Sequence, residues 1–146
     1  MNPDATTDSE QGEVTVEFLV VTLLVLIPLI YLVLTISELQ RAGFALEAGA
    51  REASRILTAK PDAKGYELAF SSAALALEDQ GIDVPPELMS VTCLKAPCPG
   101  PSGEAEIHLK TQVTLPLLPD FLAQHLPVSI PVEATRSIQW GPYVAP

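Results

Sequence analysis

The stretch GEVTVEFLVVTLLVLIPLIYLVLTIS (Gly12–Ser37) decides how this chain is built. From Phe18 to Ser37 it contains no charged residue, and Leu, Val and Ile dominate its composition. At a helical rise of about 1.5 Å per residue, ~20 residues match the ~30 Å hydrocarbon core of a bilayer. We therefore expect a transmembrane helix over residues 13–38.

One acidic residue, Glu17, directly precedes the uncharged run. A carboxylate inside hydrocarbon costs up to about 2.5–3.5 kcal/mol at the centre of a helix and less near the interface, so such a group usually has a partner. The position of Glu17 therefore makes it a functional candidate.

The residues around Gly12 resemble the processing motif of type IV pilins and pseudopilins. In that superfamily a membrane peptidase cuts after a glycine, the fifth residue of the mature chain is a glutamate, and an apolar helix follows. Here the processing site would be the bond between Gly12 and Glu13, and Glu17 would be the fifth mature residue. The pair Glu17–Phe18, followed at once by the apolar run, resembles the TadE-like minor pseudopilins of the Flp/Tad (tight adherence) branch.

This resemblance implies a minor pilin-like subunit of a Tad/Flp-type pilus or related secretion filament, involved in pilus assembly and adhesion. The implied partners are the prepilin peptidase, other pilus subunits and the assembly platform proteins. Residues 1–12 would be a cytoplasmic leader, and Glu17 with Phe18 would contribute to subunit assembly. The alternative is a single-pass membrane-anchored surface binding module that never polymerises and keeps its leader.

The charges flanking the span predict a different orientation. No Lys or Arg precedes the span, whereas Arg41, Arg51 and Arg55 follow it, so the positive-inside rule places the C-terminal part in the cytoplasm, as in a membrane-bound regulator. The pilin-like interpretation requires this part to lie outside the cytoplasm. Long domains translocate largely regardless of charge, which favours the outside orientation.

Cys93 and Cys98 are the only cysteines, and they lie in the proline-rich segment CLKAPC. In a small extracytoplasmic domain this spacing indicates a local disulfide, worth about 2 kcal/mol for so short a loop. Free thiols remain the alternative. A metal site is the third reading, although His108 and His125 lack the close spacing of a zinc motif.

Helical periodicity continues beyond the span through residues 39–60. Spacings of three and four residues predict a packing seam made of Leu39, Ala42, Leu46, Gly49, Ala53 and Ile56. Because several of these residues are very small, the seam allows close approach of another backbone. It can serve the chain's own domain, neighbouring subunits, or both.

Residues 61–146 predict a small α+β domain. The break Lys60–Gly65 precedes a short amphipathic helix, Tyr66–Gln80, which Gly81 ends. Period-two alternation then predicts strands at Met89–Leu94, Ile107–Leu115 and Val128–Trp140. The fold class is therefore a long N-terminal helix, a second short helix and a three-stranded antiparallel sheet packed on the helices. The apolar link before the last strand, residues 115–127, is expected to pack on the sheet or to contact a partner.

Several function classes are not supported by the sequence. With 18 acidic and 8 basic residues and a formal net charge of −10, the chain lacks the basic face that nucleic acid requires. We find no nucleophile with a base, no phosphate-binding loop and no metal-ligand cluster. We therefore expect no enzymatic activity, no cofactor, no metal and no small-molecule substrate.

Overall fold

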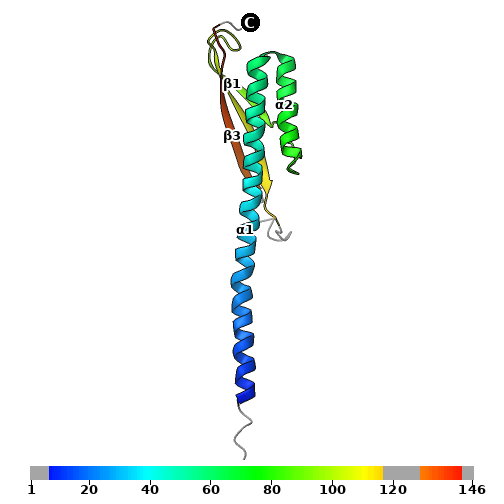
Figure 1. Cartoon of the computed structure of the whole chain (residues 1–146), viewed down its shortest axis with the longest axis vertical. Coiled ribbons are helices and arrows are strands. Elements are labelled where there is room, and N and C mark those ends of the chain that lie inside the picture. The colour runs from blue at the N-terminus through cyan, green and yellow to red at the C-terminus, as the bar shows by residue number, and fades with distance from the viewer. Residues whose placement is uncertain (1–6, 117–128, 143–146) are drawn as a thin grey trace, which may run out of the picture. The chain divides into compact units, whose positions relative to one another are not determined.

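The computed structural model describes the backbone of residues 7–116 and 129–142, with side chains described from residue 14 onward. Its elements follow the order α1 (Thr7–Ala59), α2 (Ala63–Glu78), β1 (Met89–Lys95), β2 (Glu104–Thr114) and β3 (Ser129–Gln139) (Figure 1). This order confirms the expected α+β class, with a long helix, a short helix and a three-stranded antiparallel sheet. The link at residues 117–128, including His125, lies outside the described residues.

The chain forms two compact units, residues 1–36 and residues 37–146. Helix α1 contributes to both, because its backbone is helical without interruption from Thr7 to Ala59. Residues 39–60, which the sequence marks as an extension of the span, therefore belong to the same compact unit as the C-terminal domain.

Helix α2 begins three residues earlier than its apolar periodicity predicts. Asp62 has extended backbone angles, and its carboxylate accepts a hydrogen bond of 2.6 Å from the Gly65 backbone N–H. This N-cap satisfies one of the donors that the first turn of a helix leaves unpaired. The helix therefore starts at Ala63, within the stretch that the sequence indicates as a break. Gly81, at φ 66°, follows the helix as expected.

The sheet has the strand order β1-β2-β3, and both pairs are antiparallel. Leu109 in β2 lies opposite Met89 on one side and Ala134 on the other, and all three are buried. Strand β2 alternates cleanly, with Ala105, Ile107, Leu109, Thr111 and Val113 buried and their neighbours more exposed. One face of the sheet therefore carries the core, as period-two alternation implies.

The helices cover the apolar face of the sheet and form one core with it. Fully or nearly fully buried residues from all five elements join a single cluster, among them Leu46, Leu77, Met89, Leu109 and Ile138. Trp140 closes this core beyond β3, where its ring is buried and its Nε1–H donates to the Leu57 carbonyl at 3.2 Å. That bond satisfies one of the carbonyls left open in the last turns of α1.

The predicted seam of α1 faces the chain's own domain. Ala42, Leu46, Gly49 and Ala53 are buried, whereas Leu39 and Ile56 are half-buried. A Cβ built on Gly49 would lie 3.2 Å from the Cα of Ala73 in α2 and 3.3 Å from Leu109 in β2. The sequence left open whether this face packs on the chain's own domain or on neighbouring subunits. In the structure it packs within the domain.

We predict that Gly49→Leu lowers the free energy of unfolding by about 1–3 kcal/mol, because the new side chain overpacks the contact with Ala73 and Leu109. The matched control is Gly43→Leu in the same helix, where nothing lies within 4 Å of a built Cβ. There the change should stabilise the helix by up to about 1 kcal/mol. Thermal unfolding of both variants in detergent measures the difference, and equal melting temperatures would contradict the assigned contact.

Candidate membrane anchor and assembly segment

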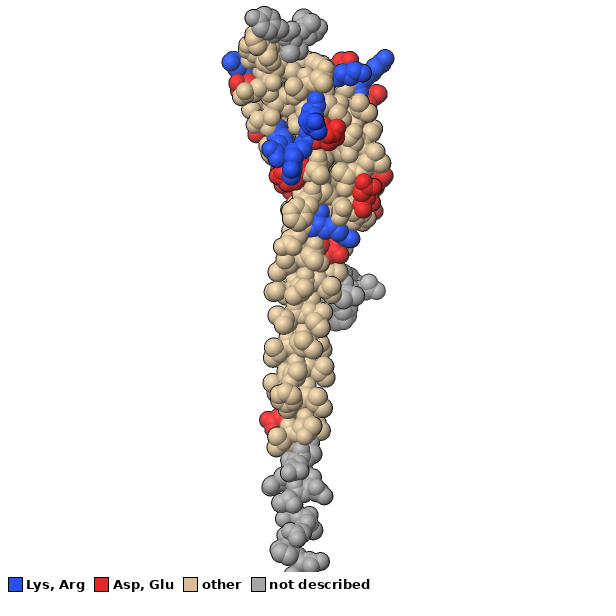
Figure 2. All heavy atoms as spheres, viewed as in Figure 1, with Lys and Arg blue, Asp and Glu red and all other residues tan. Residues whose placement is uncertain are grey.

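The first half of α1 exposes an uninterrupted apolar surface. Every Val, Leu, Ile and Phe side chain from Val14 to Ile36 is exposed, and the most apolar window of this helix has a mean hydropathy of 2.9 with none of it buried. Figure 2 shows this part of the helix as uncharged surface except for one acidic position. Each such side chain left in water forfeits about 1.5–3 kcal/mol relative to full burial. The segment fits a single-pass membrane anchor.

Glu17 is the only Asp, Glu, Lys or Arg between Val14 and Ser37, and it is exposed on this apolar helix. No ion pair or hydrogen bond reaches its carboxylate from the residues whose side chains are described. Its neighbour Phe18 is 68% exposed. Both residues are therefore available to a partner outside the chain.

The bond between Gly12 and Glu13 lies inside α1, which starts at Thr7. The side chains of these two residues fall outside the described part of the chain. Residues 13 and 17 are four positions apart in a continuous helix, so they lie on the same helix face one turn from each other.

The structure brings Cys93 and Cys98 together as two thiols. Cys93 ends the regular part of β1, and Cys98 lies in the following loop, where its Sγ–H donates to the Glu104 carbonyl at 3.6 Å. Burial raises the pKa of the Cys98 thiol to about 11, and the hydrogen bond and charge interaction with Cys93 add to the shift. The thiol of Cys98 is therefore held protonated at neutral pH.

His108 is the described histidine with charged neighbours. Its Nε2 lies 3.2 Å from Glu106, and its Nδ1 lies 3.3 Å from Glu133. Because the two carboxylates contact opposite ring nitrogens, they do not converge on one point with the histidine. Among the described residues, no group of three or more His, Cys, Asp and Glu side chains is arranged to hold a metal ion.

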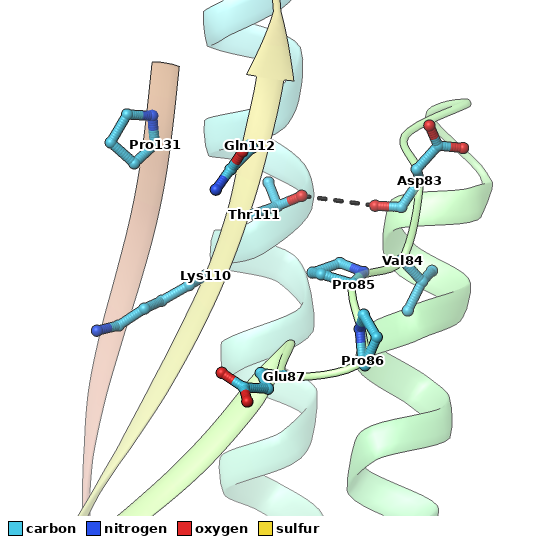
Figure 3. Close-up of a pocket in the computed structure, with 9 residues that line it drawn as sticks. All are labelled: Asp83, Val84, Pro85, Pro86, Glu87, Lys110, Thr111, Gln112 and Pro131. Carbon is cyan, nitrogen blue, oxygen red and sulfur yellow. Dashed lines mark hydrogen bonds between the residues drawn. The ribbon is translucent and has the colours of Figure 1, made fainter. Parts of the chain in front are cut away.

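Among the described residues, several cavities open on the C-terminal unit. One, of about 630 Å³, is bordered by Asp83, Pro85, Glu87, Lys110 and Thr111, among others (Figure 3). Thr111 donates to the Asp83 carbonyl across it at 3.5 Å, and the side chains of Lys110 and Asp83 extend in opposite directions. The described lining therefore offers no converging set of catalytic groups.

A second cavity, of about 380 Å³, is bordered by Tyr66, Cys93, Cys98 and Trp140, together with apolar side chains. Asp62 is its lining carboxylate, and that group already caps α2. The two thiols therefore face a mainly apolar hollow whose lining carboxylate is already engaged at the N-cap of α2.

Sequence reasoning missed the ion pair between Arg136 and Glu47, whose Nη2 and Oε2 atoms lie 3.0 Å apart. Arg136 sits at an even position of β3, where the pattern otherwise places apolar residues facing the helices. The presence of a charged residue at an otherwise apolar position could have indicated that Arg136 has an acidic partner on a helix. The pair joins the last strand to α1 across 89 positions of sequence.

Comparison with protein-family models, with curated proteins and with solved structures finds no match to this chain.

We expect alkylation of Cys98 in the reduced, folded protein to remain slow at neutral pH and to rise only toward pH 11, because the thiolate is the reactive form. Cys93→Ala should lower the pKa of Cys98, since two of the three causes of its shift come from Cys93. Residue-resolved mass spectrometry of alkylation rates against pH measures both effects. The denatured chain, in which thiols titrate near ~8.5, is the control, and a similar midpoint in the folded chain would contradict the assigned environment.

Taken together, the geometry identifies one chemical feature that demands a partner, the exposed apolar segment Val14–Ile36 with its single carboxylate. A single candidate membrane-spanning helix of this kind is consistent with association of the chain with a membrane.

Proposed function

We propose that this chain is a minor pilin-like subunit, similar to the TadE-like pseudopilins, of a Tad/Flp-type pilus or related secretion filament. The observation that carries the proposal is a fully exposed apolar helix, interrupted only by Glu17, that runs into a small α+β domain. A permanent lipid anchor needs no charge at this position. A segment that exchanges lipid for an apolar bundle of neighbouring helices can use one charge to define register.

In this proposal the prepilin peptidase removes residues 1–12 and leaves Glu13 as the mature N-terminus. The new α-amino group carries a positive charge at the start of the helix. In an apolar bundle each isolated charge is strongly unfavourable, whereas a pair of opposite charges offsets much of both desolvation penalties. The Glu17 carboxylate of one subunit would therefore pair with the α-amino group of a neighbour.

The C-terminal domain is proposed to lie outside the cytoplasm. Arg41, Arg51 and Arg55 oppose this orientation under the positive-inside rule. However, the domain at residues 61–146 is longer than the short loops for which that rule operates, so it can translocate despite these charges. The proposal joins Cys93 and Cys98, which line the same cavity, in a local disulfide, because an oxidising compartment outside the cytoplasm favours such a bond.

One observation favours the alternative of a surface binding module that stays anchored and never polymerises. The small-residue seam at Ala42, Leu46, Gly49 and Ala53 is occupied by the chain's own domain, so it offers no surface to neighbouring subunits. Such a module would use the apolar segment only as an anchor. It would retain its leader and would not depend on Glu17.

Processing is the first test. We expect the mature chain to begin at Glu13 in cells that contain the peptidase, and Gly12→Leu to block cleavage, because peptidases of this class require a residue without a side chain at the cut. Mass spectrometry of the mature N-terminus gives the answer directly. A chain that begins at Met1 in such cells would exclude the pilin-like subunit and leave the anchored module.

Substitutions at Glu17 should distinguish membrane insertion from subunit assembly. Glu17→Ala makes the segment more apolar, so membrane level and Gly12 cleavage should match the parent, while association with other pilus subunits should weaken by about 3–5 kcal/mol, as when one partner of a buried pair is removed. Glu17→Asp should be intermediate, because it keeps the charge but shortens its reach. Cross-linking to pilus subunits measures the effect. Normal cross-links from Glu17→Ala would mean that Glu17 plays no part in subunit assembly and only adds a favourable negative charge near the helix N-terminus.

Orientation is tested by the cysteines. In protein taken from cells without reductant, we expect Cys93 and Cys98 to resist a thiol-reactive mass tag, because they would be joined in a disulfide. Prior reduction is the control and should make both residues reactive. Full labelling of both residues in denatured protein without reduction would instead favour the cytoplasmic orientation.

A further inference from the structure

A third cavity lies where α1 enters the C-terminal unit. It has a volume of about 180 Å³ and is bordered by the start of the α1 segment of this unit, the turn after α2 and the end of β2. Its polar lining includes Glu38, Arg41, Asp83, Gln112 and Thr114. Pockets for drug-sized ligands measure about 300–1,000 Å³, so this space suits a smaller polar group.

The position of this cavity along α1 matches the level of lipid headgroups. The uncharged run ends at Ser37, and Glu38 and Arg41 follow it in an unbroken helix. At a rise of about 1.5 Å per residue, their backbones lie about 1.5 and 6 Å beyond the end of the run. The polar layer on each side of the ~30 Å hydrocarbon core is about 5–7 Å thick. Figure 2 shows the change from uncharged to charged surface along α1.

The lining of this cavity carries charges of both signs. Arg41 donates from Nη2 to Oε2 of Glu38, and the two side chains are 42% and 32% exposed. Because a pair this exposed contributes little to stability, both partners can turn to a ligand. Asp83 supplies a second carboxylate, which extends away from the larger cavity drawn in Figure 3 and forms no ion pair with the described residues.

The C-terminal end of α2 adds to the negative potential at this cavity. Gly81 borders the cavity and lies three residues beyond Glu78, where α2 ends. A helix C-terminus bears partial negative charge and attracts cations, yet the last turn of α2 contains no basic residue. The two lining carboxylates and the helix end therefore favour a cation, while the guanidinium of Arg41 favours an anion beside it.

We propose that this cavity binds the headgroup of a phospholipid that carries a primary ammonium group beside its phosphate, as phosphatidylethanolamine does. Arg41 pairs with the phosphate, because a guanidinium presents several donors in a fixed fork. Glu38 and Asp83 accept hydrogen bonds from the ammonium, which has three N–H donors. A choline headgroup has no N–H to donate. A glycerol headgroup leaves the two carboxylates without a cation beside its phosphate.

A bound headgroup would hold the base of the C-terminal unit at the bilayer surface, because α1, the turn after α2 and β2 all border the cavity. This inference rests on the membrane span that the proposed function shares with its alternative. It does not depend on cleavage after Gly12, on Glu17 or on which side of the membrane the domain lies.

The test uses the full chain reconstituted into vesicles of phosphatidylethanolamine, phosphatidylcholine and phosphatidylglycerol in equal parts. Native mass spectrometry after mild detergent extraction identifies the lipid that stays bound. We expect phosphatidylethanolamine to be retained at least about threefold over either of the others. Carbodiimide activation of carboxylates in the vesicles should also join the lipid amine to Glu38 or Asp83 as an amide, which peptide mass spectrometry locates.

The variant Glu38→Gln with Arg41→Gln keeps the net charge and should abolish the preference, and it should also reduce the amide formed at Asp83. The matched control is Glu52→Gln with Arg55→Gln, which removes a pair with the same spacing about 21 Å farther along α1 and should behave like the parent. Asp83→Asn alone should lower the retention of phosphatidylethanolamine. Circular dichroism checks that each variant is folded.

Flotation with the vesicles reports on the anchor separately. A chain that floats but retains the three lipids equally, or prefers phosphatidylglycerol, would overturn the headgroup site and leave the anchor in place. A chain that does not float would overturn both, and an equal loss of preference in the control variant would overturn the site. Protection of Glu38 and Asp83 by soluble phosphoethanolamine in detergent, without a preference among lipids in vesicles, would assign the cavity to a free small molecule instead.

Discussion

The close approach of α1 to α2 and β2 at Gly49 is the contact on which the C-terminal unit depends. A three-stranded sheet has one apolar face to cover, and two helices must both reach it to exclude water from a core this small. Because Gly49 has no side chain, Ala73 and Leu109 occupy the space that a Cβ would need, and three elements meet at this point. Alanines on both helices, including Ala42, Ala53 and Ala69, extend this close packing along the interface. Dispersion contacts at such distances are individually weak and collectively large.

Helix α1 covers the apolar face of the sheet only with its second half. From Val14 to Ile36 its side chains are apolar on all faces and exposed, whereas beyond Ser37 one face is buried in the domain and the other is charged. A helix that is apolar all round is suited to hydrocarbon, and an amphipathic helix is suited to a domain surface. One continuous backbone thus carries two segments matched to two different environments, and Glu17 is the one position in the first segment that hydrocarbon does not favour.

Charged residues in the C-terminal unit divide into those that serve the fold and those that face outward. The pair between Arg136 and Glu47 links β3 to α1, so it acts between distant parts of the chain. Arg51 and Arg55 have only local partners on α1, and Glu78 and Asp79 have none among the described residues. The outward-facing arginines of α1 are therefore each balanced by a glutamate of the same helix, within a chain whose formal net charge is −10.

Sequence alone determined the class of the fold and the anchor, because both follow from periodicity and length. The unbroken apolar run predicts the span, and period-two alternation predicts the strands. The predicted start of β2 at Ile107 was three residues late, because the small inward-facing residue Ala105 gives only a weak apolar signal. In the structure β2 starts at Glu104. The predicted start of α2 was three residues too late, because the N-cap depends on the backbone geometry of Asp62 and not on the spacing of apolar residues. Only the tertiary structure decided what the α1 seam contacts, that Arg136 reaches Glu47, and that Phe44, Leu68 and Leu75 are left uncovered. These facts depend on which elements become neighbours in space, and residue spacing within one element carries no information about the element that packs against it.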